Sequence, residues 1–151
     1  MSKIGIATNT PYRELLLVDA AVGLGGQNSP EDVMAVQYLL RVASETAGSS
    51  ESFQPPGEKP ISIDGSCGRQ TQTYISFFQA EVNRRQHRKL VEPDGRVDPV
   101  LSGSGRSSIT HTFYTILALN AALRSRRGDA FHLEEDPLMP AALKSKVFLK
   151  F

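Results

Sequence analysis

The 151-residue sequence contains a single cysteine and no tryptophan. With Cys67 as its one thiol, the chain cannot form an intrachain disulfide, which excludes a disulfide-stapled secreted module. We interpret Cys67 as a small apolar residue beneath a turn, because no flanking His or Lys would activate it as a nucleophile. Without tryptophan, any stacking on sugar rings would fall to tyrosine and phenylalanine side chains.

The chain also lacks a strong charge of either sign and a long apolar run. Its 17 basic and 16 acidic residues give a net charge of +1, which argues against a nucleic-acid partner. The apolar run at residues 15–18 is too short to cross a membrane. The apolar stretch near the amino terminus is too short for a signal peptide and is interrupted by Asn9, Thr10 and Pro11. We therefore predict synthesis in the cytoplasm without a signal peptide. The protein would remain there, or reach the periplasm or cell wall by a route other than the Sec pathway.

Residues that would support catalysis or metal binding are scattered. His87, His111 and His132 show no zinc-ligand spacing, and the segment around Ser66 lacks the pattern of a nucleophile elbow. Nothing in the sequence pairs two carboxylates for glycoside hydrolysis. We predict a protein that is not an enzyme and that uses no cofactor or metal.

Apolar periodicity predicts three helices. Ser29, Pro30 and Asp32 suggest an N-cap, a first helical residue and a capping box for the first helix, which fades near residue 47. Gln37 flanks its core stripe and, if buried, must be hydrogen-bonded to a neighbouring loop. The second helix is predicted over residues 69–88, and the third from Ser107 or Ser108 to a cap at Gly128. The predicted core positions are Val33, Val36, Leu40, Ala43, Ile75, Phe78, Val82, Phe113, Ile116, Leu117, Asn120 and Leu123.

Two Asp-Gly turns separate these helices. Glycine supplies the positive φ that such turns need, and we expect Asp64 and Asp94 to accept backbone N–H bonds within them. The first turn runs through Gly65 and Gly68 into Thr71 at the start of the second helix. The second turn has Gly95 after Asp94. A further glycine-rich loop at residues 23–26 lacks the Lys-Ser or Lys-Thr of a phosphate loop.

These segments resemble, in order, the repeat of bacterial peptidoglycan-binding domains. The matching pieces are residues 22–40, the run 63–71 continuing to Phe78 and Gln79, and residues 93–99 followed by 110–120. The resemblance implies a mainly α fold, a three-helix bundle over residues 22–128 with irregular or short β extensions at 1–21 and 129–151. In this resemblance Asp64, Gly65, Gly68, Thr71, Gln79, Asp94 and Gly95 are structural motif residues.

The resemblance implies peptidoglycan, through its stem peptide or glycan, as the ligand class. The groove would lie near the start of the second helix, where peptide N–H groups favour anions such as stem-peptide carboxylates. Arg69, Gln70, Tyr74 and Arg96 are the ligand-binding side chains that we predict beside the motif.

A second interpretation is a protein-interaction or structural component of a phage or of a contractile, type VI-like secretion system. The Ser/Pro/Gly-rich insertion at residues 48–60 is either a mobile surface loop or, through Phe53 and its prolines, a partner-binding edge. The tail carries Glu134, Glu135 and Asp136, expected to be solvated. The tail's end either pairs with the lead-in around residues 4–6 or binds a protein partner through Val147, Phe148, Leu149 and Phe151. If the insertion or the tail covers the start of the second helix, wall binding is disfavoured.

Overall fold

The computed structural model describes residues 3–6, 14–46, 51–100, 112–128 and 132–144. Within these ranges the chain is mainly helical, as predicted, with two small antiparallel sheets. The helices are α1 (Pro30–Ala43), α2 (Arg69–Gln86), α3 (Thr115–Arg127), the short α4 (Ala141–Lys144) and the 3-10 turn η1 (Leu133–Glu135). The strands are β1 (Lys3–Ile6), β2 (Glu14–Leu17), β3 (Val22–Gly23) and β4 (Arg96–Val97), paired as β1–β2 and β3–β4.

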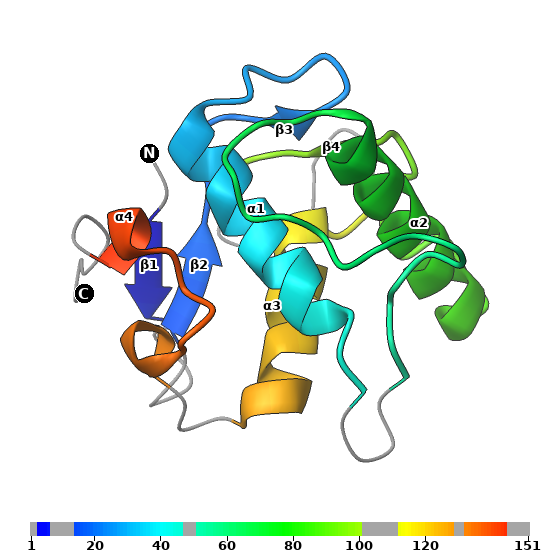
Figure 1. Cartoon of the computed structure of the whole chain (residues 1–151). Coiled ribbons are helices and arrows are strands. Elements are labelled where there is room, and N and C mark those ends of the chain that lie inside the picture. The colour runs from blue at the N-terminus through cyan, green and yellow to red at the C-terminus, as the bar shows by residue number, and fades with distance from the viewer. Residues whose placement is uncertain (1–2, 7–13, 47–50, 101–111, 129–131, 145–151) are drawn as a thin grey trace.

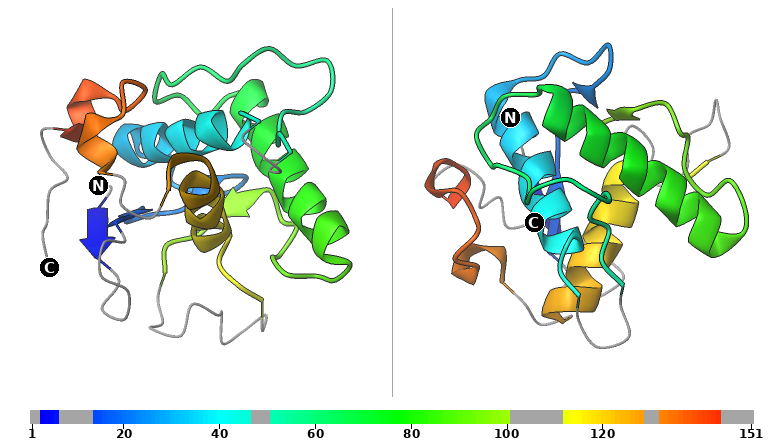
Figure 2. Two further views of the ribbon diagram at one scale, coloured as in Figure 1. Left: turned by 90° about the horizontal axis from the view of Figure 1, so that it is seen from below. Right: turned by 45° about the vertical axis from the view of Figure 1, so that its right-hand side comes forward.

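Helix α1 occupies the centre of the molecule (Figure 1). The β1–β2 hairpin and α4 lie on one side of it, α2 lies on the other, and α3 packs across it, as the two further views in Figure 2 also show. The apolar positions predicted from helical spacing meet in this core, apart from Leu117, which is partly buried against it, and Phe113, which is half-buried and precedes α3. Full burial of such side chains is worth about 1.5–3 kcal/mol each relative to exposure. Fully or almost fully buried core residues include Val33, Val36, Leu40, Ile75, Phe78, Ile116, Leu119 and Leu123.

The lead-in segment is a hairpin attached to α3. Strand β1 pairs with β2 in the register Lys3↔Leu17 to Ile6↔Glu14. Buried Asn120 of α3 donates to the Leu16 carbonyl oxygen at 3.0 Å and accepts from the Leu16 N–H at 2.9 Å. The Asn120 side-chain amide therefore pairs with the backbone of β2 as a residue of a neighbouring strand would. The tail residues Val147, Phe148, Leu149 and Phe151 lie outside the described residues.

The predicted capping box at α1 is wrong. The helix begins at Pro30 with Ser29 as the N-cap residue, but Ser29 makes no side-chain cap bond. Asp32 is fully buried and accepts the backbone N–H groups of Asp19 and Ala20, each at 3.2 Å. The segment after β2 passes over the start of the helix, and the Asp32 carboxylate binds the backbone of that segment instead of the helix N-terminus.

The start predicted for α3 is also wrong. Ser107 and Ser108 lie outside the described residues, and the helix begins at Thr115. Phe113 is extended and bridges Val91, with its N–H donating to the Leu90 carbonyl oxygen at 2.9 Å. This tertiary pairing keeps the backbone before Thr115 out of the helix. The end at Gly128 is confirmed, with φ +90° at the cap.

Asp136 does not have the solvated environment expected for the acidic tail segment. Glu134 and Glu135 are exposed, whereas Asp136 is only 1% exposed. Its carboxylate accepts from the Tyr38 hydroxyl at 2.6 Å and from Arg127 at 3.1 Å. Burial raises the pKa of Asp136, but the hydrogen bonds from Tyr38, the Leu138 N–H and Arg127 outweigh burial and lower it overall. The residue attaches the C-terminal segment to α1 and α3.

Candidate functional site

A buried glutamine amide organises the first Asp-Gly turn. Gln37 of α1 donates from Nε2 to the Asp64 carboxylate, the Ser66 carbonyl oxygen and the Thr71 hydroxyl, each at 3.0 Å. Its Oε1 accepts the N–H groups of Asp64 at 3.0 Å and Gly65 at 2.9 Å. The predicted tie between Gln37 and a neighbouring loop is confirmed, and it joins α1, the turn and the first turn of α2.

A second glutamine organises the second turn in the same way. Gln79 of α2 donates to the Asp94 carboxylate at 3.3 Å, the Arg96 carbonyl oxygen at 2.9 Å and the Thr115 hydroxyl at 3.1 Å. Its Oε1 accepts the Gly95 N–H at 2.8 Å. The arrangement of helix glutamine, Asp-Gly turn and threonine of the next helix therefore occurs twice. Thr115 was missed in the sequence because it stands much farther after its turn than Thr71 does.

Each turn has the predicted internal geometry. The carboxylates of Asp64 and Asp94 accept the N–H two residues later, at 2.9 and 3.0 Å. Gly65 and Gly95 have φ of +79° and +72°, which side-chain-bearing residues rarely adopt. The bond from the Ser66 N–H, followed by that from Gln37, lowers the pKa of Asp64. Gly68 is the N-cap residue of α2, as the motif predicted.

Three of the predicted ligand residues contact residues 58–62 instead of lining an open groove. Tyr74 is fully buried, and its hydroxyl donates to the Lys59 carbonyl oxygen. Gln70 accepts the Ser62 N–H at 3.1 Å. Arg69 has a side chain that is 81% exposed and pairs with Glu58 at 3.4 Å. The segment therefore covers one side of the start of α2, and Arg69 is the side chain of this group that solvent reaches freely.

Arg96 of β4 has a different set of neighbours. It donates to Asp98 at 2.8 Å and lies 3.9 Å from the Asp94 carboxylate. The glycine-rich loop after β3 lies beside it, and Leu24 of that loop is 66% exposed. The structure thus places Arg96 in the β3–β4 pair beside Asp94 and Asp98, while Gln70 and Tyr74 contact residues 58–62.

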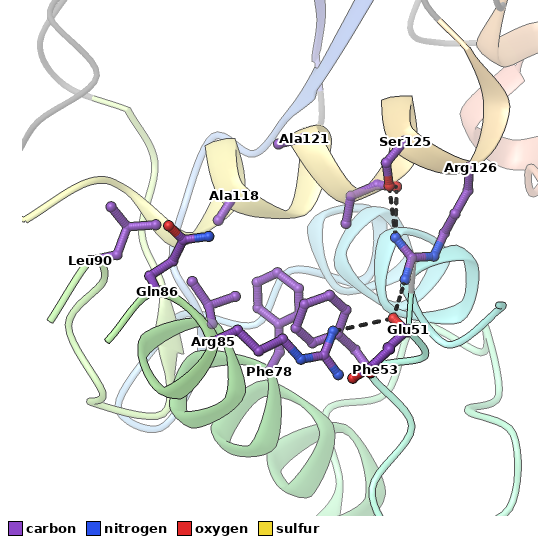
Figure 3. A pocket seen from close by; sticks show the side chains of 12 residues that line it. Glu51, Phe53, Phe78, Arg85, Gln86, Leu90, Ala118, Ala121, Ser125 and Arg126 are labelled. Atoms are coloured by element: carbon purple, nitrogen blue, oxygen red, sulfur yellow. Dashed lines mark hydrogen bonds between the residues drawn. The ribbon is translucent and has the colours of Figure 1, made fainter. Parts of the chain in front are cut away.

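The large hollow lies between α2 and α3, a position that the sequence did not indicate. It is an open groove of about 540 Å³ with a mostly apolar floor (Figure 3). Phe53 contributes to it and packs on Phe78 with the ring centroids 4.7 Å apart. The described part of the predicted insertion therefore packs onto α2. The apolar residues of the groove are Phe53, Phe78, Val82, Leu90, Ala118, Ala121 and Ala122.

Two arginines form one rim of the groove. Arg85 and Arg126 both donate to the Glu51 carbonyl oxygen, at 3.2 and 2.6 Å, as the dashed lines in Figure 3 mark. Their guanidinium carbons lie 3.9 and 5.6 Å from the centre of the Phe53 ring, within cation–π range. Arg126 also donates to the carbonyl oxygens of Glu45 and Ala122. Both cations are held in place before any ligand arrives.

The rim carries positive charge that its acidic neighbours only partly offset. Glu81 is shared by Arg84 and Arg85, whose hydrogen bonds lower its pKa to about 2. Within the described ranges, Arg126 contacts carbonyl and hydroxyl oxygens and no carboxylate. Burial, followed by repulsion from Arg85, lowers its pKa. A ligand carboxylate at this rim would relieve that repulsion.

Comparison with protein-family models, curated proteins and solved structures gives no match. Among the helices of the described residues, none has the length and apolarity needed to span a bilayer. The same part of the chain shows no group of three His, Cys, Asp or Glu side chains placed to hold a metal ion. Cys67 is half-buried, and burial raises the pKa of its thiol.

Proposed function

We propose that this chain is a non-catalytic binding module, built on a three-helix peptidoglycan-binding-like bundle, whose ligand is bacterial peptidoglycan. The observation that carries the proposal is the repeated network around Gln37 and Gln79. It gives nearly every residue of the motif a defined structural role: both Asp-Gly turns, Thr71 and the glutamine that follows Phe78. Such agreement between a sequence motif and its contacts supports the resemblance from which the ligand class comes.

Arg69 and Arg96 are the side chains that we propose for the ligand carboxylates. Arg69 is the first residue of α2, where unpaired peptide N–H groups favour anions. Its pair with Glu58 is exposed on the arginine side and contributes little stability, so Arg69 can exchange Glu58 for a ligand. Gln70 and Tyr74 support the site by holding residues 59–62 against α2.

Sedimentation with insoluble peptidoglycan sacculi tests this function. We expect the wild type to sediment and an Arg69→Ala/Arg96→Ala variant to lose at least about tenfold in affinity, since each charge-assisted hydrogen bond is worth roughly 1.5–3 kcal/mol. The matched control is Arg84→Ala/Lys89→Ala, which removes the same charge from exposed positions in the last turn of α2 and just after the helix. A wild type that stays in the supernatant at physiological salt contradicts wall binding.

A second candidate is a protein-interaction or structural component of a phage or of a contractile, type VI-like secretion system. Two observations favour it: residues 58–62 cover one side of the start of α2, and the large groove lies elsewhere, between α2 and α3. Either function is compatible with the proposed synthesis in the cytoplasm and delivery by a non-Sec route. Failure to sediment with sacculi, in a protein shown to be folded, would favour this candidate.

A further inference from the structure

The α2–α3 groove is longer than its main hollow. A second hollow of about 310 Å³ shares Leu90 and Ala118 with the first and is otherwise lined by Arg88, Phe113 and Leu117. The two hollows are therefore adjacent, one on each side of Leu90 and Ala118. Two adjacent hollows suit a segment of polypeptide, which can place one side chain in each of them.

The floor of the groove selects for apolar groups. Ala118, Ala121 and Ala122 present only methyl groups from α3, so space remains above them for side chains from another molecule. Gln86 and Ser125 are the uncharged polar residues of the lining. A glycan would leave most of its hydroxyl groups without partners on such a floor, which is unfavourable. Leucine, isoleucine or phenylalanine side chains would lose only apolar surface.

The rim selects for negative charge. Arg85 and Arg126 line the first hollow and exposed Arg88 lines the second, while Glu51 is the one acidic side chain among the described residues that line either hollow. A guanidinium has five N–H donors, and contacts among the described residues use three on Arg85 and four on Arg126. Donors remain for a carboxylate, and side chains already fixed lose little freedom on binding.

We propose that this groove binds a short segment of a protein partner in which apolar side chains are flanked by aspartate or glutamate. The apolar side chains fill the two hollows, and the acidic side chains meet Arg85 and Arg126 at one end and Arg88 at the other. The site goes beyond the proposed wall-binding function, because it uses neither Arg69 nor Arg96.

Selection of a random peptide library on the immobilised full chain, followed by fluorescence anisotropy of the enriched peptides, tests the proposal. We expect peptides with an apolar pair next to acidic residues, and an affinity that falls as salt rises. Ala121 is exposed on α3 and lines the groove, so Ala121→Glu and Ala121→Lys form a matched pair of good helix formers with opposite charge. We expect Ala121→Glu to weaken binding roughly fivefold to tenfold and Ala121→Lys to maintain or strengthen it.

Several results would overturn this assignment: no enriched peptide, a basic or purely apolar consensus, or equal binding by the two Ala121 variants with circular dichroism showing both folded. The same variants are assayed on sacculi. Loss of sedimentation in Ala121→Glu alone would make the groove the wall site and refute a protein segment as its occupant. Unchanged sedimentation beside lost peptide binding supports two separate sites. If the wild type does not sediment with sacculi, peptidoglycan is refuted as the ligand, and the peptide-binding result is unaffected.

Discussion

Replacing Gln37 by leucine should detach the first Asp-Gly turn from α1. Leucine has nearly the same volume and fits the apolar surroundings of α1, but it offers no hydrogen bonds. Five contacts disappear, and the Asp64 and Gly65 N–H groups lose their acceptor. The buried Thr71 hydroxyl loses its amide donor. The perturbation therefore removes a polar network while leaving the core volume intact.

The expected loss of stability depends on how many of the lost hydrogen bonds water can replace. A net intramolecular hydrogen bond is worth about 0.5–1.5 kcal/mol, and an unsatisfied buried group costs about 1–3 kcal/mol. Asp64 is exposed and Gly65 half-buried, so water recovers part of the loss at the turn. We expect the free energy of unfolding to fall by about 3 kcal/mol, which for a chain of this size lowers the melting temperature by roughly 6–12 °C.

Urea denaturation followed by circular dichroism measures this change, and amide hydrogen exchange at Asp64 and Gly65 localises it. Gln72→Leu is the matched control, because Gln72 is a half-buried glutamine of α2 whose side chain, among the described residues, hydrogen-bonds only to the Cys67 sulfur, at 3.6 Å. We expect the control to change stability by less than about 0.5 kcal/mol. A Gln37→Leu loss below about 1 kcal/mol, or one no larger than that of the control, would refute the view that this amide holds the turn.

Two further predictions concern backbone space and pH. Gly23→Ala should destabilise the protein by about 3 kcal/mol or more, because a Cβ there would lie 2.3 Å from the Gly95 carbonyl oxygen. Gly57 also has a positive φ but lies in open space, so Gly57→Ala should cost only about 1 kcal/mol. Equal losses in urea denaturation would contradict the close approach of Gly23 to Gly95. Hydrogen bonds from Arg127 to Glu45, from Ser66 and Gln37 to Asp64, and from Arg84 and Arg85 to Glu81 lower the pKa of each carboxyl group, that of Glu81 to about 2. A carboxyl group with a lowered pKa in the folded state contributes stability above its ordinary pKa, and this stability is lost when the group is protonated. The free energy of unfolding should therefore fall as the pH drops from about 5 to 2, and Glu81→Gln should flatten the lower end of that curve. A free energy of unfolding that is independent of pH over this range would contradict this prediction.

The parts of the fold that sequence patterns predicted are those set by local rules. The apolar spacing of α1 and α2, the positive φ of Gly65 and Gly95, and the cap at Gly128 depend on residues close in the chain, and all were confirmed. Gln37 was also recognised, because a polar residue beside a core stripe must find partners. Such rules do not need the tertiary structure.

The parts that escaped depend on partners far away in the chain. Asp32 matches a capping box locally, but the segment after β2 arrives and takes its carboxylate. Asp136 belongs to an acidic run, but Tyr38 and Arg127 draw it into the interior. The α2–α3 groove forms only when the two helices pack together, so the sequence pattern of either helix alone does not predict it. The burial of Tyr74 depends on the same kind of contact, since its hydroxyl donates to the Lys59 carbonyl oxygen.

The repeated glutamine network has a consequence for how the chain can be altered. In both helix junctions, one glutamine amide hydrogen-bonds to main-chain atoms of the turn. The position of Asp64 therefore depends on Gln37 rather than on the path of the chain from the end of α1. Changes in the length of the connection between α1 and that turn are therefore tolerated at its exposed positions, such as Gly57, as long as Phe53, Ile61 and Lys59 keep their contacts. This makes Gly57 a suitable place to graft a tag, a label or a new recognition loop.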